Sequence, residues 1–366
     1  MQTILELRNI SKSFDGKAVI SDLSLALPQG SIGCLLGASG CGKTTALRTI
    51  AGFETPDTGR ILINDRLVAD PKGGVPPEKR RIGMVFQDYA LFPHLTVKEN
   101  VNFGLRRAPG AEQNRRISEL LEVVGMSAFQ DQYPHELSGG QQQRIALARA
   151  LAPQPEILLL DEPFSNLDVA LRERLSMEVR DILKQSGTSA ILVTHNQHEA
   201  FAMADAIGVM HNGQLEQWDS AYNLYHRPVS LYVANFIGEG VLLPGKVLAD
   251  RQVETGLGTL SGQFSYPCRN GCPAHILIRP EDVVHDHDSK YKAKVLSKNF
   301  RGPNILYTLL LPSKDTILSL VPSHHDHKIG EEIGIVPQVE EIILFEELST
   351  PLHSFPSSDD SHIVMG

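Results

Sequence analysis

The chain has 366 residues, of which 42% are hydrophobic and 21% are charged, and its formal net charge is −9. This length accommodates two domains with cores of their own, and the acidic balance disfavours a partner that is bound through phosphates, so no nucleic acid partner is expected. Four cysteines, at positions 34, 41, 268 and 272, are too few and too unevenly spaced for a disulfide framework.

Short apolar runs alternate with helical patterns through the first two-thirds of the chain. Strands are predicted at residues 4–11, 31–37, 60–64, 81–87, 156–163, 189–195 and 206–210. Several of these runs are apolar throughout, which is typical of strands buried on both faces of a mainly parallel sheet. Helical periodicity predicts helices at residues 43–51, 113–124, 139–152, 169–185 and 197–204. The first two-thirds therefore reads as an α/β core.

Two changes of pattern indicate further units. Residues 88–152 contain no convincing strand, which predicts a helical subdomain inserted into the α/β core. After residue 238, short strands with frequent turns predict a small all-β domain over residues 239–350. The tail at 351–366 is polar and is expected to be disordered.

The sequence shows no pattern typical of a signal peptide or a membrane-spanning segment. The N-terminus alternates like a strand and lacks the basic-then-apolar layout of a signal peptide. No stretch approaches the roughly eighteen apolar residues that a membrane span needs. We expect a chain that works in the cytosol and that can still dock on a membrane protein.

A glycine-rich loop follows the strand predicted at 31–37. The stretch GASGCGKTT, from Gly37 to Thr45, fits the phosphate-binding loop of nucleotide-binding proteins. Its glycines let backbone N–H groups turn toward the β- and γ-phosphates, Lys43 supplies a positive charge, and the Thr44 hydroxyl ligates Mg²⁺. An accidental match is expected in about one per cent of chains of this size. The predicted contacts are Gly37, Ser39, Gly40, Cys41, Gly42, Lys43, Thr44 and Thr45.

Polar side chains end three further strands of the predicted sheet. Asp161 and Glu162 follow an apolar run, and alone they would as often be solvated acids. With a phosphate loop upstream, Asp161 is interpreted as a Mg²⁺ ligand and Glu162 as the base that polarises the attacking water. His195 is predicted at the same sheet edge, within reach of the γ-phosphate, although a histidine at a strand end is more often structural. The amide oxygen of Gln87 is a further candidate Mg²⁺ ligand.

A second glycine-flanked helix start lies in LSGGQQQRIALARAL, residues 137–151. Ser138 is positioned to cap this helix, and a capped helix start with free N–H groups binds anions. The chain already has one complete nucleotide site. We therefore expect Ser138, Gly139, Gly140 and Gln141 to contact the nucleotide held by a second copy related by a two-fold axis, so that hydrolysis requires dimer closure.

Together these motifs resemble the ATP-binding subunits of ATP-binding-cassette (ABC) transporters. The matching stretches are GASGCGKTT, Gln87, LSGGQ, ILLLDEP, SNLD at 165–168 and His195, which cover about residues 4–238 in the family's order. The resemblance implies an ABC-type domain with a P-loop NTPase core, ATP and Mg²⁺ as cofactors, Phe14 stacked on adenine, and Asp168 coupling the two sites of a dimer. Phe14 stands where tyrosine is commoner, and Asn166 where alanine is commoner; neither puts ATP hydrolysis in doubt.

The all-β remainder resembles the OB-like regulatory domain of importers for sugars, polyamines, sulfate and ferric iron, through LIRPEDV at 277–283. Ala38, AGFETPDTG at 51–59 and FIGEG at 236–240 are most similar to ferric-iron importer subunits. This resemblance implies a homodimeric ATPase at the cytoplasmic face of a bacterial inner membrane. Its partners would be integral membrane permease subunits and, indirectly, a periplasmic substrate-binding protein. Another cargo, or a soluble non-transport ABC ATPase, is the alternative.

Three further features are an apolar segment, two histidine-rich stretches and a pair of cysteines. The segment after Gln87 offers Tyr89, Leu91, Phe92 and Leu95 as a surface for docking the permease, unless these side chains fill the subdomain's own core. Histidines in HDHD at 285–288 and HHDH at 324–327 are expected to be solvated turn residues rather than a metal sensor. Cys268 and Cys272 are expected to be free thiols, because no second pair exists.

Overall fold

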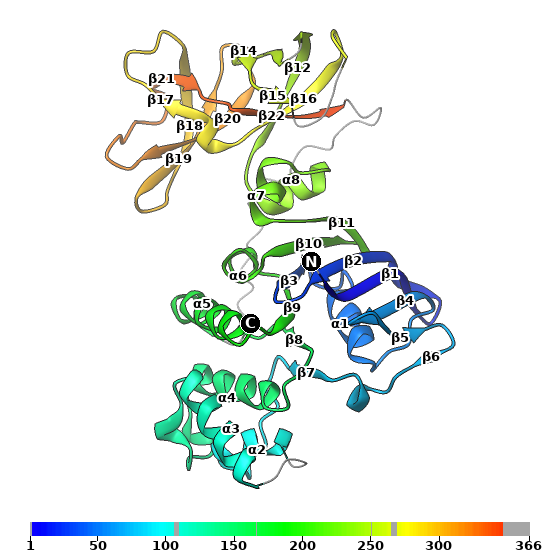
Figure 1. Cartoon of the computed structure of the whole chain (residues 1–366). Helices are drawn as coiled ribbons and strands as arrows, with labels where there is room; N and C mark the ends of the chain where they lie inside the picture. The colour runs from blue at the N-terminus through cyan, green and yellow to red at the C-terminus, as the bar shows by residue number, and fades with distance from the viewer. Residues whose placement is uncertain (1, 106–109, 166, 250, 265–268, 347–366) are drawn as a thin grey trace, which may run out of the picture. The chain divides into compact units, whose positions relative to one another are not determined.

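The computed structural model describes residues 2–105, 110–165, 167–249, 251–264 and 269–346. Within it the chain divides into two compact units, Met1–Val233 and Ala234–Gly366 (Figure 1). The division lies inside helix α8 (Leu231–Ile237), shortly before the boundary expected at residue 238. Three expectations, on Asn166, Cys268 and the tail at 351–366, concern residues outside the described part of the chain.

A six-stranded sheet, in the order β11-β10-β3-β9-β8-β7, forms the centre of the N-terminal unit. Its strands are β3 (Ile32–Gly37), β7 (Ile82–Val85), β8 (Ile157–Asp161), β9 (Ser189–Thr194), β10 (Ala206–His211) and β11 (Gln214–Asp219). All neighbours pair in parallel except β10 and β11. Every residue of β3 and β9 is buried, so the prediction of a mainly parallel sheet covered on both faces is confirmed.

A second, antiparallel sheet has the order β2-β1-β4-β5-β6. It comprises β1 (Thr3–Phe14), β2 (Lys17–Pro28), β4 (Thr58–Ile63), β5 (Arg66–Asp70) and β6 (Gly73–Gly74). Sequence analysis did not predict β2. Helix α1 (Lys43–Ala51) supplies Leu47 and Ile50 to one apolar core that also contains side chains of both sheets. This shared core holds the start of α1 beside the end of β3.

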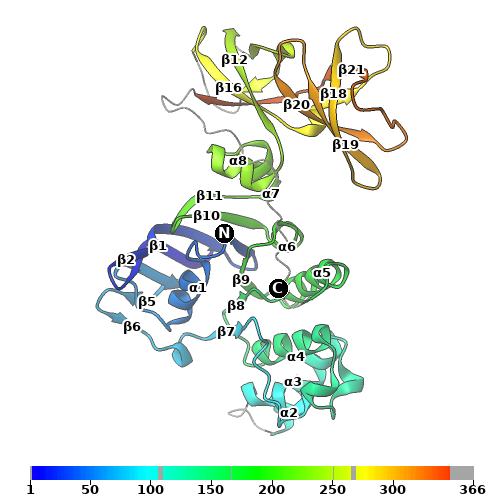
Figure 2. The ribbon, with the colours of Figure 1, turned by 180° about the vertical axis from the view of Figure 1, so that it is seen from behind.

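Residues 88–152 form the predicted helical subdomain, in which the described residues include no strand. It contains α2 (Val97–Asn102), α3 (Gly110–Val123) and α4 (Gly139–Leu151), with short 3₁₀ turns η2 (Phe103–Leu105), η3 (Ser127–Phe129) and η4 (Pro134–Glu136). Figures 1 and 2 show these three helices gathered beyond β7. The remaining elements of the unit are η1 (Pro77–Lys79), α5 (Val169–Gln185), α6 (Gln197–Met203) and α7 (Ala221–His226).

The C-terminal unit is built almost entirely of strands, as predicted. One sheet runs β14-β13-β12-β16-β22-β15 and the other β17-β21-β18-β19-β20. Their bounds are β12 (Val241–Ala249), β13 (Gln252–Thr255), β14 (Gly258–Ser261), β15 (Gln263–Phe264), β16 (Pro273–Ile278), β17 (Val283–His285), β18 (Lys292–Phe300), β19 (Asn304–Leu310), β20 (Thr316–Pro322), β21 (Glu332–Pro337) and β22 (Glu341–Glu346), with the 3₁₀ turn η5 (Pro280–Asp282). Alternate residues of both sheets enclose one apolar core, which gives the barrel-like OB architecture.

None of the helices in the described residues combines the length and apolar character that crossing a bilayer requires.

Candidate functional site

The loop between β3 and α1 wraps around the side chain of Lys43. This side chain is only 4% exposed, and its Nζ donates hydrogen bonds to the carbonyl oxygens of Gly37 and Ala38, at 2.8 and 2.9 Å. A Cβ at Gly37 would lie 2.5 Å from the carbonyl oxygen of Met210 and 2.7 Å from Sγ of Cys41. The loop can therefore approach β10 only because position 37 is glycine.

Helix α1 begins at a glycine in the left-handed conformation. Gly42 has φ 103°, and a Cβ there would lie 2.6 Å from the carbonyl oxygen of Val19. Among the described residues, no side chain caps this helix start. Its first backbone N–H groups, at the positive end of the helix, are thus left to an anion. Ser39 and Gly40 of the same loop are exposed, and Cys41 is buried.

Thr44 on α1 and Asp161 at the end of β8 bring a hydroxyl and a carboxylate together. The Thr44 hydroxyl donates to Oδ1 of Asp161 at 3.3 Å. Desolvation raises the pKa of Asp161, and the hydrogen bond from Thr44 opposes this shift. Strand β7 ends at Val85 rather than at Gln87, so Gln87 lies in the turn beyond it. Because Val85 pairs with Leu160, that turn leaves the sheet at the same edge as Asp161.

Glu162 and His195 meet at the ends of two neighbouring strands. Oε2 of Glu162 is 3.2 Å from Nδ1 of His195, and their side chains are 20% and 52% exposed. Glu162 has φ 42°, an uncommon conformation for a residue with a side chain, and its N–H donates to the carbonyl oxygen of Val193 at 3.0 Å. The Ser165 hydroxyl donates to the carbonyl oxygen of Glu162 at 3.0 Å. This backbone is held by hydrogen bonds on both sides, as strained backbone at functional sites commonly is.

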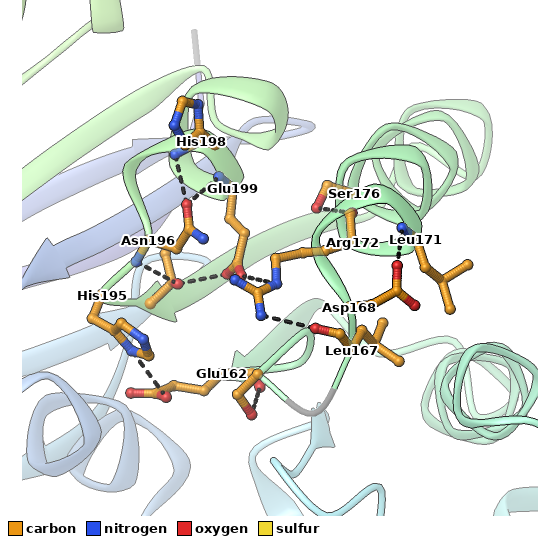
Figure 3. A network of polar contacts seen from close by, with 12 residues as sticks. Glu162, Leu167, Asp168, Leu171, Arg172, Ser176, His195, Asn196, His198 and Glu199 are labelled. Atoms are coloured by element: carbon orange, nitrogen blue, oxygen red, sulfur yellow. Dashed lines mark hydrogen bonds and ion pairs between the residues drawn. The ribbon is translucent and has the colours of Figure 1, made fainter. Parts of the chain in front are cut away.

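A separate network of polar contacts starts at Thr194, the residue before His195, and reaches helices α5 and α6 (Figure 3). The Thr194 hydroxyl accepts from the N–H of Asn196 at 3.0 Å and donates to Oε2 of Glu199 at 2.5 Å. Oε1 of Glu199 lies 3.5 Å from Nε of Arg172. Glu199 is 4% exposed; desolvation raises its pKa, while Thr194 and Arg172 oppose that shift. The buried ion pair therefore ties α5 to the strand end that carries His195.

The far end of the network reaches the turn before α5. Nη2 of Arg172 donates to the carbonyl oxygen of Leu167 at 2.9 Å. Oδ1 of Asp168 accepts the N–H of Leu171 at 3.0 Å, which makes Asp168 the cap of α5. Sequence reasoning identified Asp168 and missed both Arg172 and Glu199. The two missed residues lie far apart in the chain, and no local pattern indicates that they pair.

The second glycine-flanked helix start satisfies one of its own N–H groups with a side chain. Oγ of Ser138 accepts the N–H of Gln141 at 3.4 Å, and Oε1 of Gln141 accepts the N–H of Ser138 at 2.8 Å. This arrangement is a capping box at the start of α4. Gly139 is exposed, whereas Gly140 is buried, with Cδ1 of Leu175 only 3.0 Å from where a Cβ would lie. The Ser138–Gln141 turn therefore presents backbone to its surroundings and packs tightly against α5 behind.

Phe14, the predicted adenine contact, lies at the end of β1. Its side chain is 41% exposed, and Nζ of Lys12 lies 5.1 Å from the ring centroid. An exposed aromatic ring beside a cation offers a face for stacking a base.

The apolar residues after Gln87 are more buried than a docking surface requires. Tyr89 is 5% exposed, so its predicted docking role is wrong and it belongs to the core. Leu91, Phe92 and Leu95 are half-buried. The Phe92 ring packs against Phe103, with centroids 4.3 Å apart.

Comparison with known families finds two matching models. Residues 20–165 match the family described as "ABC transporter", and residues 276–345 match the "TOBE domain". The first match spans the phosphate loop, the Ser138–Gln141 turn and the Asp161–Glu162 pair. The second match lies within the C-terminal all-β unit.

Relatives extend over most of the chain. It is 45% identical over 356 residues to the spermidine/putrescine import ATP-binding protein PotA of Oleidesulfovibrio alaskensis, covering 91% of this chain and 94% of that protein. It is 44% identical over 280 residues to the Fe(3+) ions import ATP-binding protein FbpC of Haemophilus influenzae, covering 76% and 79%. Among solved structures, cbiO1 from Clostridium perfringens, part of the ABC transporter complex cbiONQ, has a TM-score of 0.56 at 28% identity, covering 60% of this chain and 89% of that one.

Proposed function

The chain belongs to the ATP-hydrolysing, ATP-binding subunits of ABC importers, and we propose that it powers the import of ferric iron as one half of an ATP-bound homodimer. The observation that carries the catalytic part is the meeting of Glu162 with His195 beside the Thr44–Asp161 pair. These four side chains come from three different elements and converge on the end of the phosphate loop. Packing of an apolar core does not require four polar side chains to converge in this way.

The phosphate loop and Phe14 are proposed to bind the nucleotide. The loop from Gly37 to Thr45, which includes the uncapped start of α1, holds the β- and γ-phosphates through backbone N–H groups. Lys43 exchanges its two bonds to the loop carbonyls for phosphate oxygens. Phe14 stacks on the adenine ring.

Glu162 and His195 are proposed to act on the attacking water and the γ-phosphate. The Glu162 carboxylate accepts a hydrogen bond from the water and orients it for in-line attack. His195, more exposed than Glu162, contacts the γ-phosphate from the neighbouring strand end. The strained backbone of Glu162 keeps its carboxylate aimed in one direction.

The residues present fit a bound Mg²⁺ ion. Mg²⁺ takes oxygen ligands and typically uses one or two protein side chains together with substrate phosphates. Thr44 and Asp161 supply a hydroxyl and a desolvated carboxylate within hydrogen-bond distance of each other, and Gln87 supplies an amide oxygen at the same sheet edge. A bound Mg²⁺ would neutralise charge on the phosphates.

We propose that the Ser138–Gln141 turn completes the site of a second copy. The exposed Gly139 and the N–H groups at the start of α4 are suited to a γ-phosphate, and the two-fold arrangement gives each copy one phosphate loop and one such turn. Asp168, tied through Leu167 and Arg172 to the strand end of His195, is proposed to couple the two sites.

The membrane partners follow from the family, because an ABC transporter subunit of this type works on permease subunits in the membrane. We propose that the chain binds them at the cytoplasmic face of a bacterial inner membrane and that a periplasmic binding protein delivers the cargo. The helical subdomain is proposed as the docking region, with Leu91 and Phe92 partly exposed at its start.

Cargo is the finer part of the proposal. Ala38 and the stretches at 51–59 and 236–240 favour ferric iron. The 45% identity to a spermidine/putrescine import protein over nearly the whole chain favours polyamine as the second candidate. Uptake of radioactive ferric iron and of radioactive putrescine in a deletion strain, each restored or not by this gene, decides between them. Restored putrescine uptake without restored iron uptake would overturn the iron proposal.

The catalytic proposal is tested with Glu162→Gln. This change removes the base and keeps the shape, so we expect ATP binding to survive and turnover to fall by about a hundredfold or more. The variant is expected to run as a dimer in sizing experiments with ATP and Mg²⁺. Exposed Glu173→Gln is the matched control and keeps wild-type turnover. Near-normal hydrolysis by Glu162→Gln would contradict the assignment.

A further inference from the structure

Two histidine-rich stretches of the C-terminal unit come together in the fold. His285 ends β17, while His325 and His327 lie between β20 and β21. The ring centroid of His285 is 5.0 Å from that of His325 and 4.7 Å from that of His327. We name these three residues the histidine cluster. The expectation of solvated turn residues holds for the exposed His324 and His325. It does not describe the His285 ring, which lies close to the rings of both His325 and His327.

Hydrogen bonds fix the tautomers of two of these rings. Nδ1 of His285 lies 3.0 Å from the carbonyl oxygen of Gly334, and Nδ1 of His327 lies 2.9 Å from Oε1 of Glu331. A carbonyl oxygen only accepts. The Glu331 side chain also accepts the N–H of Lys328 at 2.8 Å, and as a carboxylate it accepts from His327 as well. Each neutral ring therefore carries its proton on Nδ1 and a lone pair on Nε2.

The lone pair of His327 lacks a protein donor. Its Nε2 atom is buried and has no hydrogen-bond partner among the described residues. The side chain as a whole is 16% exposed. Leaving a buried acceptor unsatisfied destabilises the folded state. A positively charged ligand at this point would remove that cost.

The loop that carries two of the rings is held rigidly. Tyr307 is fully buried, and its hydroxyl donates to the carbonyl oxygen of His325 at 3.0 Å and accepts the N–H of His327 at 2.9 Å. Lys298 pairs with the intervening Asp326, and its Nζ donates to the carbonyl oxygen of His327 at 3.1 Å. The backbone is therefore preorganised, and only side-chain rotation is left to adjust.

We propose that the histidine cluster binds one divalent transition-metal ion of the zinc type, with Nε2 of His285 and of His327 as two ligands and His325 as the third. Zinc–nitrogen bonds of about 2.0–2.1 Å put the centroids of two ligand rings roughly 5 Å apart, which matches both spacings in the cluster. Ligand histidines nearly always donate their other N–H to a carboxylate or a backbone carbonyl, as His327 and His285 do in this unit.

One adjustment is needed on binding. With the side chains placed as they are, no group of three His, Cys, Asp or Glu among the described residues could hold a metal ion. His325 is exposed, so its ring can turn toward the other two without repacking a core.

The donor set also selects the ion. Imidazole nitrogen favours Zn²⁺, Ni²⁺ and Cu²⁺, whereas Mg²⁺ prefers oxygen. The histidine cluster is therefore expected to ignore Mg²⁺. This selectivity distinguishes it from the Thr44–Asp161 pair of the N-terminal unit. An ion held by His285, His325 and His327 would link β17 to the β20–β21 connection and stabilise the C-terminal unit.

The test is a Zn²⁺ titration of the full-length protein, without a polyhistidine tag and without nucleotide, in competition with a chromophoric chelator. We expect one equivalent of Zn²⁺ per chain, undisturbed by excess Mg²⁺. His285→Gln and His327→Gln should each lower the affinity by more than about a hundredfold, and Glu331→Gln by about 10- to 100-fold, because it removes only the partner of Nδ1. His275→Gln, on β16 of the same unit, is the matched control and keeps wild-type affinity.

The melting temperature is a second readout, and His325→Gln is a replacement variant. Zn²⁺ should raise the melting temperature of the wild-type protein and leave that of His285→Gln unchanged. If His327→Gln does not fold, His325→Gln, whose side chain is exposed, takes its place. Absence of one-to-one zinc binding in the wild type overturns the proposal. So does an affinity that His285→Gln, Glu331→Gln and His327→Gln (or its replacement His325→Gln) all leave unchanged, since the ion would then bind elsewhere.

Discussion

The two glycine-flanked helix starts of the N-terminal unit look alike in sequence and differ in structure. Helix α1 begins at Gly42 in the left-handed conformation, and no side chain among the described residues caps it. Helix α4 begins at Ser138, whose hydroxyl and N–H are both engaged with Gln141 in a capping box. The first start leaves its N–H groups to a ligand, while the second satisfies one of its own.

This difference separates a preformed anion site from a conditional one. An uncapped helix start costs free energy until an anion arrives, so the phosphate loop is ready for a nucleotide in a single chain. A capped start is stable alone, and an anion reaches it only through the exposed Gly139 or by displacing the Ser138 hydroxyl. We therefore expect α1 to determine nucleotide affinity and α4 to determine what happens once a second copy is present.

The largest expected effect is at the uncapped start. Lys43→Met removes the buried ammonium group that now bonds to the carbonyl oxygens of Gly37 and Ala38. Loss of two charge-assisted bonds predicts a fall in nucleotide affinity of about a hundredfold or more, measured with a fluorescent ATP analogue on dilute, monomeric protein. Exposed Lys17→Met is the control. An unchanged affinity in Lys43→Met would contradict the assignment of the α1 start as the nucleotide site.

The network that joins the strand end of His195 to the turn before α5 is tested at Glu199. Glu199→Ala leaves the buried Nε atom of the half-buried Arg172 without its ion-pair partner, which predicts a loss of about 1–3 kcal/mol in the free energy of unfolding. Glu199→Gln keeps a hydrogen-bond acceptor for Thr194, and burial already disfavours the charge of Glu199, so a smaller loss is expected. Denaturant unfolding compares the two variants with exposed Glu173→Ala.

Turnover separates a positioning role of Glu199 from a structural one. If Glu199 orients His195 through Thr194, Glu199→Gln lowers kcat while KM for ATP stays the same, since the phosphate loop is untouched. Equal changes of kcat and KM, or no change in either, would mean that the ion pair only stabilises the fold.

The sequence predicted the elements of this unit better than its contacts. Helices at 43–51 and 169–185 match the observed bounds, because their periodicity and caps are local. Strand β2 was missed, although its apolar residues alternate clearly. The Arg172–Glu199 pair could not be read from the chain, since its two residues meet only after α5 and α6 pack.

The same limit explains two interpretations that changed. Tyr89 looked like part of an exposed apolar surface, yet tertiary packing buries it within the helical subdomain. The stretches at 285–288 and 324–327 looked like separate polar turns, and strand pairing in the C-terminal unit brings their histidines into contact. In both cases the sequence identified the unusual residues, and only the fold determined what surrounds them.

The turn η5 contains one half of a capping box, with an ionisable acceptor in place of the Gln141 amide. In η5, Oδ2 of Asp282 accepts the N–H of Arg279 at 2.7 Å, as Gln141 does for Ser138. Burial raises the pKa of Asp282 to about 6. The folded state therefore keeps a proton that the unfolded chain releases near pH 4, so stability falls as pH rises from about 4 to about 6 and stays lower above that range.

The expected change is on the order of 2 kcal/mol in the free energy of unfolding of the C-terminal unit. Asp282→Asn should remove this pH dependence, and exposed Asp288→Asn should keep it. Urea unfolding at about pH 4 and about pH 7, on either side of the range in which Asp282 titrates, measures the change. A wild-type protein that gains stability over this range through Asp282 would contradict the expected direction.

The smallest expected effect is at the capped start itself. Ser138→Ala removes the hydroxyl that accepts the N–H of Gln141, which costs about 1 kcal/mol of helix stability. Nucleotide affinity of the dilute monomer should stay at the wild-type value, because α1 is unaffected. Turnover at saturating ATP should fall several-fold, since the turn can no longer offer its hydroxyl to the partner's nucleotide. Ser138→Thr keeps a hydroxyl and should recover most of the turnover. If Ser138→Ala weakened monomer binding as much as Lys43→Met does, both helix starts would belong to one site, and the distinction between a preformed and a conditional site would fail.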